Sequence, residues 1–343
     1  MHMKRIVLVA IIAMQTVVAS SQSREVIKVA SFKGIQVTGI TVSNKGRIFA
    51  NFPRWRMGVP FSVVEVMKDG SYKPYPNVGL NRWEVGPPAD SSFIGVQSVV
   101  ANGDMLYILD TANPLFKGII TQPRLFVFDL KSDKLVKTYN FPSSAVHSTS
   151  YVNDLRIDNK RNLIYFTDSG EPGIIILDTK KGLFTRVLDN HPFTKAEVNF
   201  LTFNGARMPF TVHSDGIELN ARNDILYFHA LSGYTLYGIE ISTLLDPRKL
   251  EKAKPFMMKT AAPDGMIMDE KGNLYYGDLE NNKIEYITPD RKQIRTLLEG
   301  EAVKWADTFS IHSGYLYYTN SRINEAKGDI SSMEFTINKV KLP

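Results

Sequence analysis

Residues 152–170 read VNDLRIDNKRNLIYFTDSG: a polar pair, an apolar alternation, a polar turn and a second apolar strand. The same pattern returns in HSDGIELNARNDILYFHALSG at 213–233 and in APDGMIMDEKGNLYYGDLE at 262–280. Two alternating segments joined by a turn rich in Asn, Asp, Lys or Gly are typical of a β-hairpin. The chain is therefore predicted to repeat one hairpin.

The hairpin pattern recurs along the whole chain after its first residues. Six segments carry it: 37–52, 95–110, 152–168, 214–230, 263–278 and 306–320. Second apolar pairs of strands lie between copies, for example at 124–139, 173–188 and 283–298. Two hairpins per repeat make a four-stranded antiparallel sheet, and such sheets bury their faces by stacking around an axis. The sequence thus predicts an all-β protein, a six-bladed β-propeller of four-stranded antiparallel blades.

The last copy leaves only about one further strand, SSMEFTINKV at 331–340. The segment REVIKVASF at 24–32 precedes the first copy and alternates like a strand. We predict that it pairs with the C-terminal strand and closes the ring as the outer strand of the last blade. Closure removes open sheet edges, which would otherwise favour aggregation.

The first residues have the pattern of a secretory signal peptide, with Lys4 and Arg5 before an apolar run that starts at Ile6. The run is shorter than the ~20 apolar residues that span a bilayer. We predict a signal peptide over residues 1–20 and a single propeller domain over 21–343. The mature protein is expected to be secreted or periplasmic, without a membrane span.

Composition excludes several classes of function. The chain has no cysteine, which rules out disulfides, thiolate metal sites and a cysteine nucleophile. Its net charge of +6 comes from scattered residues, so a nucleic-acid partner is not expected. No GxSxG elbow, Walker loop, HExxH motif or dinucleotide fingerprint occurs. The expected partner is a small molecule, and the oligomeric state is left open.

Equivalent positions of the first strands should converge on one mouth of the central channel. These positions hold Thr38, Val96, Asn153, Asp215, Asp264 and Asp307. Acids that converge repel one another unless they are hydrated, protonated or bound to a cation. Oxygen-only ligands suit a hard cation, and Ca²⁺ is the one cofactor suggested. The alternative is that Asp before Gly is common turn chemistry.

Three residues are candidates for catalysis. His147 and His213 each lie a few residues before a predicted channel strand, where a general base could stand. A solvated loop histidine is the alternative for both. Asp307 is the third candidate, because it belongs to the predicted mouth.

The stretch FPRWRMGVPFSVVEV at 52–66 resembles the yellow / major royal jelly protein family, whose first blade carries an Arg-Trp-Arg-x-Gly-Val-Pro phrase. The matching residues are Arg54, Trp55, Arg56, Gly58, Val59 and Pro60. The resemblance implies a six-bladed propeller. Some insect members resemble carriers of small amines in the central cavity, which implies a similar site here. The complete lack of cysteine departs from the insect pattern.

The Asn-Asp, Asp-Gly and Pro-Asp-Gly phrases are also similar to those of the gluconolactonase / regucalcin superfamily, in which a Glu, two Asn-type ligands and an Asp hold a divalent ion. Asn153, Asp215 and Asp264 match the later three positions, with Asp215 in place of an Asn. Thr38 stands at the Glu position. This resemblance implies a calcium-dependent, lactonase-like hydrolase.

Two functions from different classes therefore remain. The preferred one is an exported propeller that binds a small organic ligand, an amine among the candidates, at the channel mouth. Acids at the mouth favour a cationic guest and aromatic side chains can stack on it. The alternative is the lactonase-like hydrolase, and whether the chain is an enzyme stays open. The residues expected to bind the ligand are Thr38, Asn153, Asp215, Asp264 and Asp307.

Overall fold

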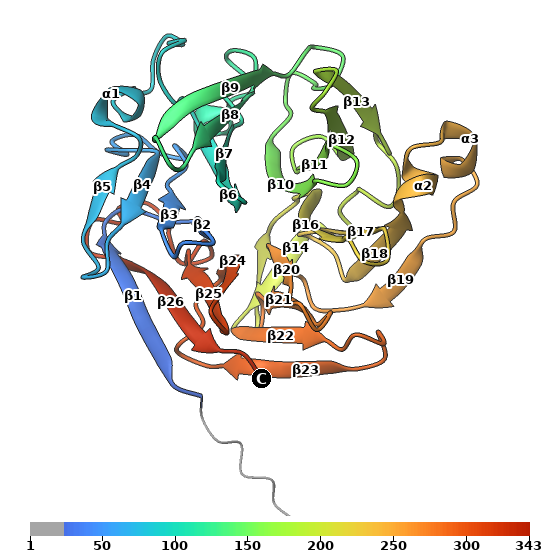
Figure 1. Ribbon diagram of the computed structural model, residues 1–343. Helices are drawn as coiled ribbons and strands as arrows, with labels where there is room; N and C mark the ends of the chain where they lie inside the picture. The colour runs from blue at the N-terminus through green and yellow to red at the C-terminus, as the bar shows by residue number, and fades with distance from the viewer. Residues whose placement is uncertain (1–23) are drawn as a thin grey trace, which may run out of the picture.

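Six four-stranded antiparallel sheets stand around a central channel (Figure 1). The computed structural model describes residues 24–343, so the predicted signal peptide lies outside the described residues. Each repeated hairpin forms the two inner strands of one blade, as the pairing of 152–158 with 163–168 illustrates. The prediction of an all-β, six-bladed propeller is confirmed.

The strands of blades one to five follow one another from the channel outward in chain order. Blades one to three comprise β2 (Gly39–Val42), β3 (Ile48–Asn51), β4 (Val63–Val66) and β5 (Tyr72–Pro74); β6 (Val96–Asn102), β7 (Met105–Asp110), β8 (Arg124–Asp129) and β9 (Lys134–Asn140); β10 (Val152–Asp158), β11 (Leu163–Asp168), β12 (Gly173–Asp178) and β13 (Leu183–Val187). Blades four to six comprise β16 (Ser214–Asn220), β17 (Ile225–Ala230), β18 (Thr235–Glu240) and β19 (Phe256–Lys259); β20 (Met266–Met268), β21 (Leu274–Asp278), β22 (Lys283–Ile287) and β23 (Ile294–Glu299); β24 (Ala306–His312), β25 (Tyr315–Asn320), β26 (Glu334–Lys341) and β1 (Val26–Lys33).

Ring closure takes place in blade six, where β1 lies alongside β26 as its outer neighbour (Figure 1). The register runs from Val26 opposite Val340 to Lys33 opposite Glu334. Phe32 on β1 is fully buried in a cluster that joins blade six to blade one. The prediction that the N-terminal segment closes the ring is confirmed.

The apolar core lies between consecutive blades. Phe49 and Val63 of blade one pack with Val99 and Ile108 of blade two, for example. Alternation along each strand sends every second side chain toward the neighbouring blade. Burying each such side chain contributes about 1.5–3 kcal/mol, so the stack of blades is held mainly by these interfaces.

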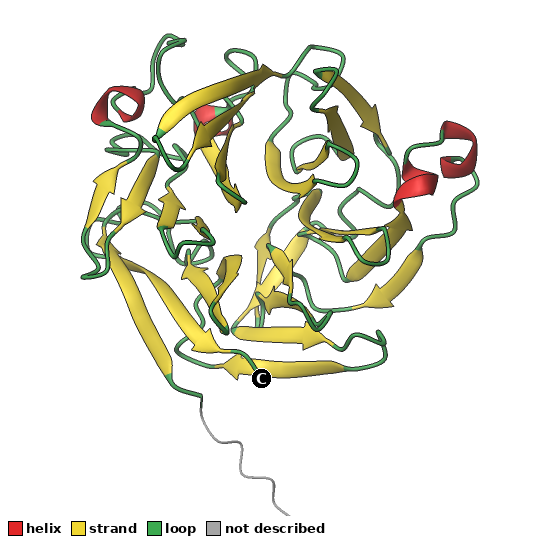
Figure 2. Cartoon of the chain, viewed as in Figure 1, coloured by secondary structure: helices red, strands yellow, loops and turns green. Residues whose placement is uncertain are grey.

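Helices are few among the described residues. The α-helices α1 (Val78–Asn81), α2 (Ile241–Leu244) and α3 (Pro247–Leu250) lie at the outer edge of the ring (Figure 2). A 3₁₀ turn, η1 (Pro114–Phe116), follows β7 and lies nearer the channel. Within residues 24–343, no helix has the length and apolar character needed to cross a membrane.

One hairpin, β14 (Phe200–Phe203) with β15 (Ala206–Pro209), stands outside the six blades. It is inserted between blades three and four and was not expected from the sequence. Its turn places Asn204 and Gly205 at φ 51° and 79°, the left-handed values that a tight hairpin turn needs. Phe203 stacks on Trp305, 5.5 Å between ring centroids, so the hairpin reaches across to blade six beside the channel mouth.

Candidate functional site

A cavity of about 380 Å³ opens at the mouth of the channel where the innermost strands begin. Its lining brings together four of the five residues predicted to bind a ligand: Asn153, Asp215, Asp264 and Asp307. Phe210 and Val212, which follow the β14–β15 hairpin, form part of the wall. A concave, largely apolar site with a few convergent polar groups is typical of small-molecule binding.

Bulges at the starts of the innermost strands place these side chains. In β10 the pairing with β11 shifts between Val152 and Leu155, which leaves Asn153 out of the regular ladder. The same shift occurs around Asp215 in β16 and around Asp307 in β24. A bulge re-aims a side chain that the strand would otherwise send toward a neighbouring blade. In these three blades the shift therefore turns one residue toward the mouth.

The glycines that follow Asp215 and Asp264 have a packing reason. A Cβ on Gly216 would lie 2.4 Å from the carbonyl oxygen of Asp264, and one on Gly265 would lie 2.5 Å from that of Asp307. The amide of Gly265 also donates to the Asp307 carbonyl at 2.7 Å. The Asp-Gly phrase is thus repeated because adjacent innermost strands touch backbone to backbone at the narrow mouth.

Asp215, Asp264 and Asp307, hereafter the acidic cluster, are buried beside one another. Burial, followed by repulsion from another member of the cluster, raises the pKa of each carboxyl well above its ordinary value. Trp305 partly offsets the burial by donating its indole N–H to Asp264 Oδ2 at 2.7 Å.

A directed chain of hydrogen bonds runs from the rim to the acidic cluster. Trp55 Nε1 donates to the Tyr151 hydroxyl at 2.5 Å, and that hydroxyl donates to Gln97 Oε1 at 2.7 Å. Gln97 Nε2 donates to Asn153 Oδ1 at 2.9 Å, and Asn153 Nδ2 donates to Asp215 Oδ2 at 2.5 Å. The indole N–H can only donate, and each later bond runs in the same direction. Asn153 therefore presents its N–H₂ group, not its oxygen, to the cluster.

This direction bears on the predicted calcium site. Ca²⁺ takes six to eight oxygen ligands, and the Asn153 oxygen is already bonded to Gln97. Within residues 24–343, no group of three or more histidine, aspartate or glutamate side chains is arranged to hold a metal ion. As oriented, the three residues do not fit a calcium shell, and binding of Ca²⁺ at Asn153, Asp215 and Asp264 stays a prediction.

Two of the six predicted mouth positions lie elsewhere. Thr38 is fully buried, accepts from Asn51 Nδ2 at 3.2 Å and does not line the cavity. Gln36 lines it in blade one instead. In blade two the lining residue is Gln97, one residue after Val96. Val96 pairs with Asp110 as Val152 pairs with Asp168, so Gln97 is the counterpart of Asn153. Counting back from the last apolar residue of the strand therefore placed the equivalent position one residue too early.

Neither candidate histidine lines the cavity. His147 is exposed, and its Nε2 lies 3.0 Å from Asp189 Oδ1 on the outer side of blade three. His213 is half-buried, and its Nδ1 accepts from the Ala196 amide at 3.0 Å. Burial lowers the pKa of His213. Asp307 is the one predicted catalytic candidate that faces the cavity.

Acidic residues at the end of the second strand of a blade stabilise the neighbouring loops. Asp110 accepts from the amides of Ile94 and Gly95 at 2.8 and 2.7 Å and pairs with Arg124 at 3.1 Å. Asp168 accepts from the Tyr151 amide at 2.8 Å in the same manner. These carboxylates hold the loops that lead into the innermost strands, and so they fix the mouth from outside.

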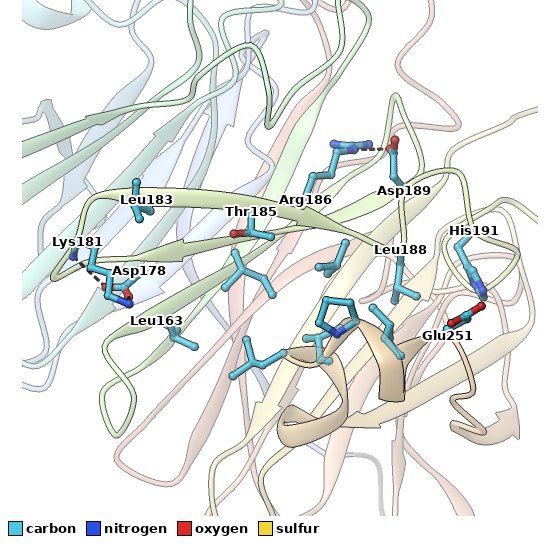
Figure 3. A pocket seen from close by; sticks show the side chains of 16 residues that line it. Leu163, Asp178, Lys181, Leu183, Thr185, Arg186, Leu188, Asp189, His191 and Glu251 are labelled. Carbon is cyan, nitrogen blue, oxygen red and sulfur yellow. Dashed lines mark hydrogen bonds and ion pairs between the residues drawn. The ribbon is translucent and has the colours of Figure 1, made fainter.

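A second pocket, of about 680 Å³, lies on the outside of the ring between β13 and helices α2 and α3 (Figure 3). Apolar side chains such as Leu163, Leu188 and Leu244 line much of it. Arg186 and Asp189 form an ion pair of 2.5 Å at its edge. No predicted site residue lies there, so the mouth cavity is the candidate site.

Residues 96–342 match the family model of the major royal jelly proteins. The chain belongs to the major royal jelly protein family. The matched region begins at the first residue of β6, so blade one and its Arg-Trp-Arg phrase lie outside it.

Curated relatives agree with this membership at low identity. Major royal jelly protein 3 of Apis mellifera is 26% identical over 246 residues, 66% of this chain and 44% of that protein. Dopaminechrome tautomerase of Drosophila melanogaster is 25% identical over 224 residues, 61% of this chain and 48% of that protein. Protein yellow of the same fly is 24% identical over 246 residues, 66% of this chain and 43% of that protein. Less than half of the length of each relative is covered.

Several solved structures share the architecture of this chain. A luciferin-regenerating enzyme has a TM-score of 0.59 at 11% identity, covering 93% of this chain and 95% of that one. A gluconolactonase from Xanthomonas campestris has 0.56 at 11%, with 95% and 93% covered. A regucalcin from Agrobacterium tumefaciens, described as calcium-binding, has 0.56 at 14%, with 94% and 96% covered. At such identities the likeness shows the fold alone.

In this member of the major royal jelly protein family, one residue of the Arg-Trp-Arg phrase has a structural role and the other two line the mouth cavity. Arg54 is buried, donates to the Asn81 carbonyl at 2.8 Å and lies 5.4 Å from the Trp83 ring. Trp55 and Arg56 point into the mouth cavity. The phrase was recognised from the sequence as a family mark, whereas the role of Arg56 in the cavity was not predicted.

Proposed function

We propose that this chain is an exported propeller that binds a small organic cation, an amine in the first place, in the mouth cavity. The observation that carries the proposal is the acidic cluster, three buried carboxyl groups that face one small cavity. Carboxyl groups that oppose one another in a buried site are relieved by a cation, which lets them ionise.

The geometry favours an ammonium group over a metal ion. An ammonium group has three N–H donors and needs only acceptors placed around it. The carboxyl oxygens of the acidic cluster are such acceptors, whereas Asn153 turns its N–H₂ group toward Asp215. Aromatic faces at the mouth, those of Trp55 and Phe116 among them, can add cation–π attraction.

The second candidate is a calcium-dependent, lactonase-like hydrolase. It is supported by the meeting of Asn153, Asp215 and Asp264 in one cavity. A gluconolactonase and a regucalcin among the similar folds are consistent with it, at the level of fold only. Binding Ca²⁺ would require Asn153 to turn its amide oxygen toward the cluster and so to lose its bond to Asp215.

Calorimetry on protein stripped with a chelator separates the two functions. Phenethylamine carries an ammonium group on an aromatic ring and should bind the wild type. Its affinity for Asp264→Asn should be at least about tenfold lower, which is a loss of about 1.4 kcal/mol in binding free energy. Asp246→Asn is the matched control, because Asp246 caps the exposed helix α3 far from the cavity. Absence of phenethylamine binding contradicts the proposal. Calcium binding to the wild type that is lost in Asp264→Asn would instead support the calcium-dependent hydrolase.

Export is part of the same proposal and has its own test. The Lys4-Arg5 and apolar pattern over residues 1–20 supports it. The intact mass of the protein recovered from periplasm or medium should correspond to a chain that lacks residues 1–20. A full-length chain retained in the cytoplasm would contradict export and leave the ligand proposal in place.

A further inference from the structure

Arg56 places a positive charge in the same cavity as the acidic cluster. Its guanidinium donates to Gln36 Oε1 at 2.9 Å and more weakly to the Ala326 carbonyl at 3.3 Å. Both acceptors are neutral, and burial lowers the pKa of the Arg56 guanidinium. A partly buried guanidinium held by neutral acceptors has capacity left for an anionic group of a ligand.

The two charges come from different blades. The acidic cluster belongs to blades four, five and six, whereas Arg56 and Gln36 belong to the chain around blade one. Both face a cavity of about 380 Å³, near the lower end of the ~300–1,000 Å³ of typical ligand sites. A single small ligand can therefore meet both charges, provided that it carries one group of each sign.

An aromatic shelf adds the third element of recognition. The Phe116 ring lies 5.5 Å from Trp55 at an interplanar angle of 29° and 5.2 Å from Tyr151 at 30°. Phe116 is 61% exposed, although both it and Leu115 adopt φ values near +57° that cost free energy for such residues. The Leu115 amide donates to the Arg54 carbonyl at 2.9 Å, which holds this turn in place. An exposed aromatic ring held in a costly conformation is suited to stacking on a flat ligand.

We propose that the ligand class of the mouth cavity is an aromatic α-amino acid, or a close zwitterionic derivative. Its ammonium group lies on the acidic cluster, its carboxylate pairs with Arg56, and its ring packs on the shelf of Trp55, Phe116 and Tyr151. This inference rests on the proposed binding of an organic cation and specifies it further. An amine without a carboxylate leaves Arg56 without a counter-charge in a partly buried site, which lowers affinity.

The test compares L-phenylalanine with phenethylamine, which share ring and ammonium and differ by the carboxylate. In calorimetric titrations the wild type should bind L-phenylalanine roughly tenfold to a hundredfold more tightly than phenethylamine. This is the gain in affinity expected from one charged, hydrogen-bonded pair. In Arg56→Gln this preference should vanish while phenethylamine still binds. Arg56→Lys keeps the positive charge but loses the paired N–H donors of the guanidinium, so it should retain part of the preference for L-phenylalanine. It replaces Arg56→Gln in this test if Arg56→Gln does not fold.

Arg207→Gln is the matched control, since Arg207 lies over Phe200 on the inserted hairpin and does not line the cavity. It should leave the preference unchanged. Equal affinities for the two ligands, or a preference that survives in Arg56→Gln, would overturn the zwitterion inference while amine binding stands. If neither ligand binds the wild type, the proposed function fails as well.

Discussion

At the scale of single residues, the three carboxyl groups of the acidic cluster oppose one another in the absence of a cation. The pKa of Asp264 is raised first by burial and then by Asp307. A carboxyl whose folded-state pKa lies above its unfolded value of about 3.9 lowers stability as the pH rises from that value through the folded-state pKa. The cluster is therefore expected to cost stability at neutral pH.

Asp264→Asn should accordingly stabilise the ligand-free protein at pH 7, by about 0.5–2 kcal/mol. The asparagine oxygen can still accept from Trp305, and one buried charge is removed. The gain should shrink as the pH falls toward the unfolded-state pKa of about 3.9, because below that value the carboxyl is protonated in both states. Urea unfolding between pH 4 and 8 measures this, with Asp246→Asn as the surface control. A variant less stable than the wild type throughout this range would contradict the account.

Gly265→Ala tests the close contact behind the Asp-Gly phrase. The added Cβ would meet the Asp307 carbonyl oxygen at 2.5 Å, so the two innermost strands must move apart. We expect a loss of about 1–3 kcal/mol in unfolding free energy and weaker phenethylamine binding. Gly86→Ala is the matched control, since its Cβ would have 3.7 Å to the nearest atom. Equal behaviour of the two variants would show that the contact is not needed.

At the scale of elements, β1 carries the closure of the ring. Phe32 is fully buried and lies 4.9 Å from the Phe52 ring of blade one. Phe32→Ala should therefore lower the free energy of unfolding by about 3–5 kcal/mol in a urea titration. Lys28→Ala, on the same strand with its side chain 57% exposed, should change it by less than about 0.5 kcal/mol. Similar small effects for both would mean that β1 is not an integral strand of blade six.

The elements also show what the sequence could predict. Strands were predictable because each blade repeats the same alternation, and the closing segment was predictable because blade six was one strand short. The inserted hairpin was missed although Asn204-Gly205 is a strong turn signal, since it fits none of the six repeats. The acids of the cluster were found by counting along the repeat. Gln97 was not, because the count began from the last apolar residue of the strand, whereas the pairing of Val96 with Asp110 makes Gln97 the counterpart of Asn153.

Contacts between segments that are distant in the chain could not be predicted from the sequence. Tyr151 meets Trp55 and Gln97 only because blades one, two and three converge on the mouth. The direction of that hydrogen-bond chain, which turns the Asn153 amide toward Asp215, depends on partners that lie on different blades. Spacing in the chain carries no such information, and the calcium prediction was made without it.

At the scale of the whole molecule, six similar blades give a frame on which very different sites can be built. Membership of the major royal jelly protein family and likeness to lactonase-type propellers are both compatible with this frame. The discriminating features are local: three acids, Arg56 and an aromatic shelf in one cavity. A cationic group that enters this cavity should lower the raised pKa values of the acidic cluster and so favour loss of protons from it.

The most direct measurement is the number of protons released when phenethylamine binds, obtained by calorimetry at one pH in buffers of different ionisation enthalpy. Because the ligand stays protonated and the cluster must ionise to pair with it, we predict release of about one proton per ligand near neutral pH. Affinity should rise with pH for the same reason, and Asp264→Asn should reduce the release. Tight binding without proton release, equal in wild type and Asp264→Asn, would contradict the claim that the acidic cluster is the receptor for the cation.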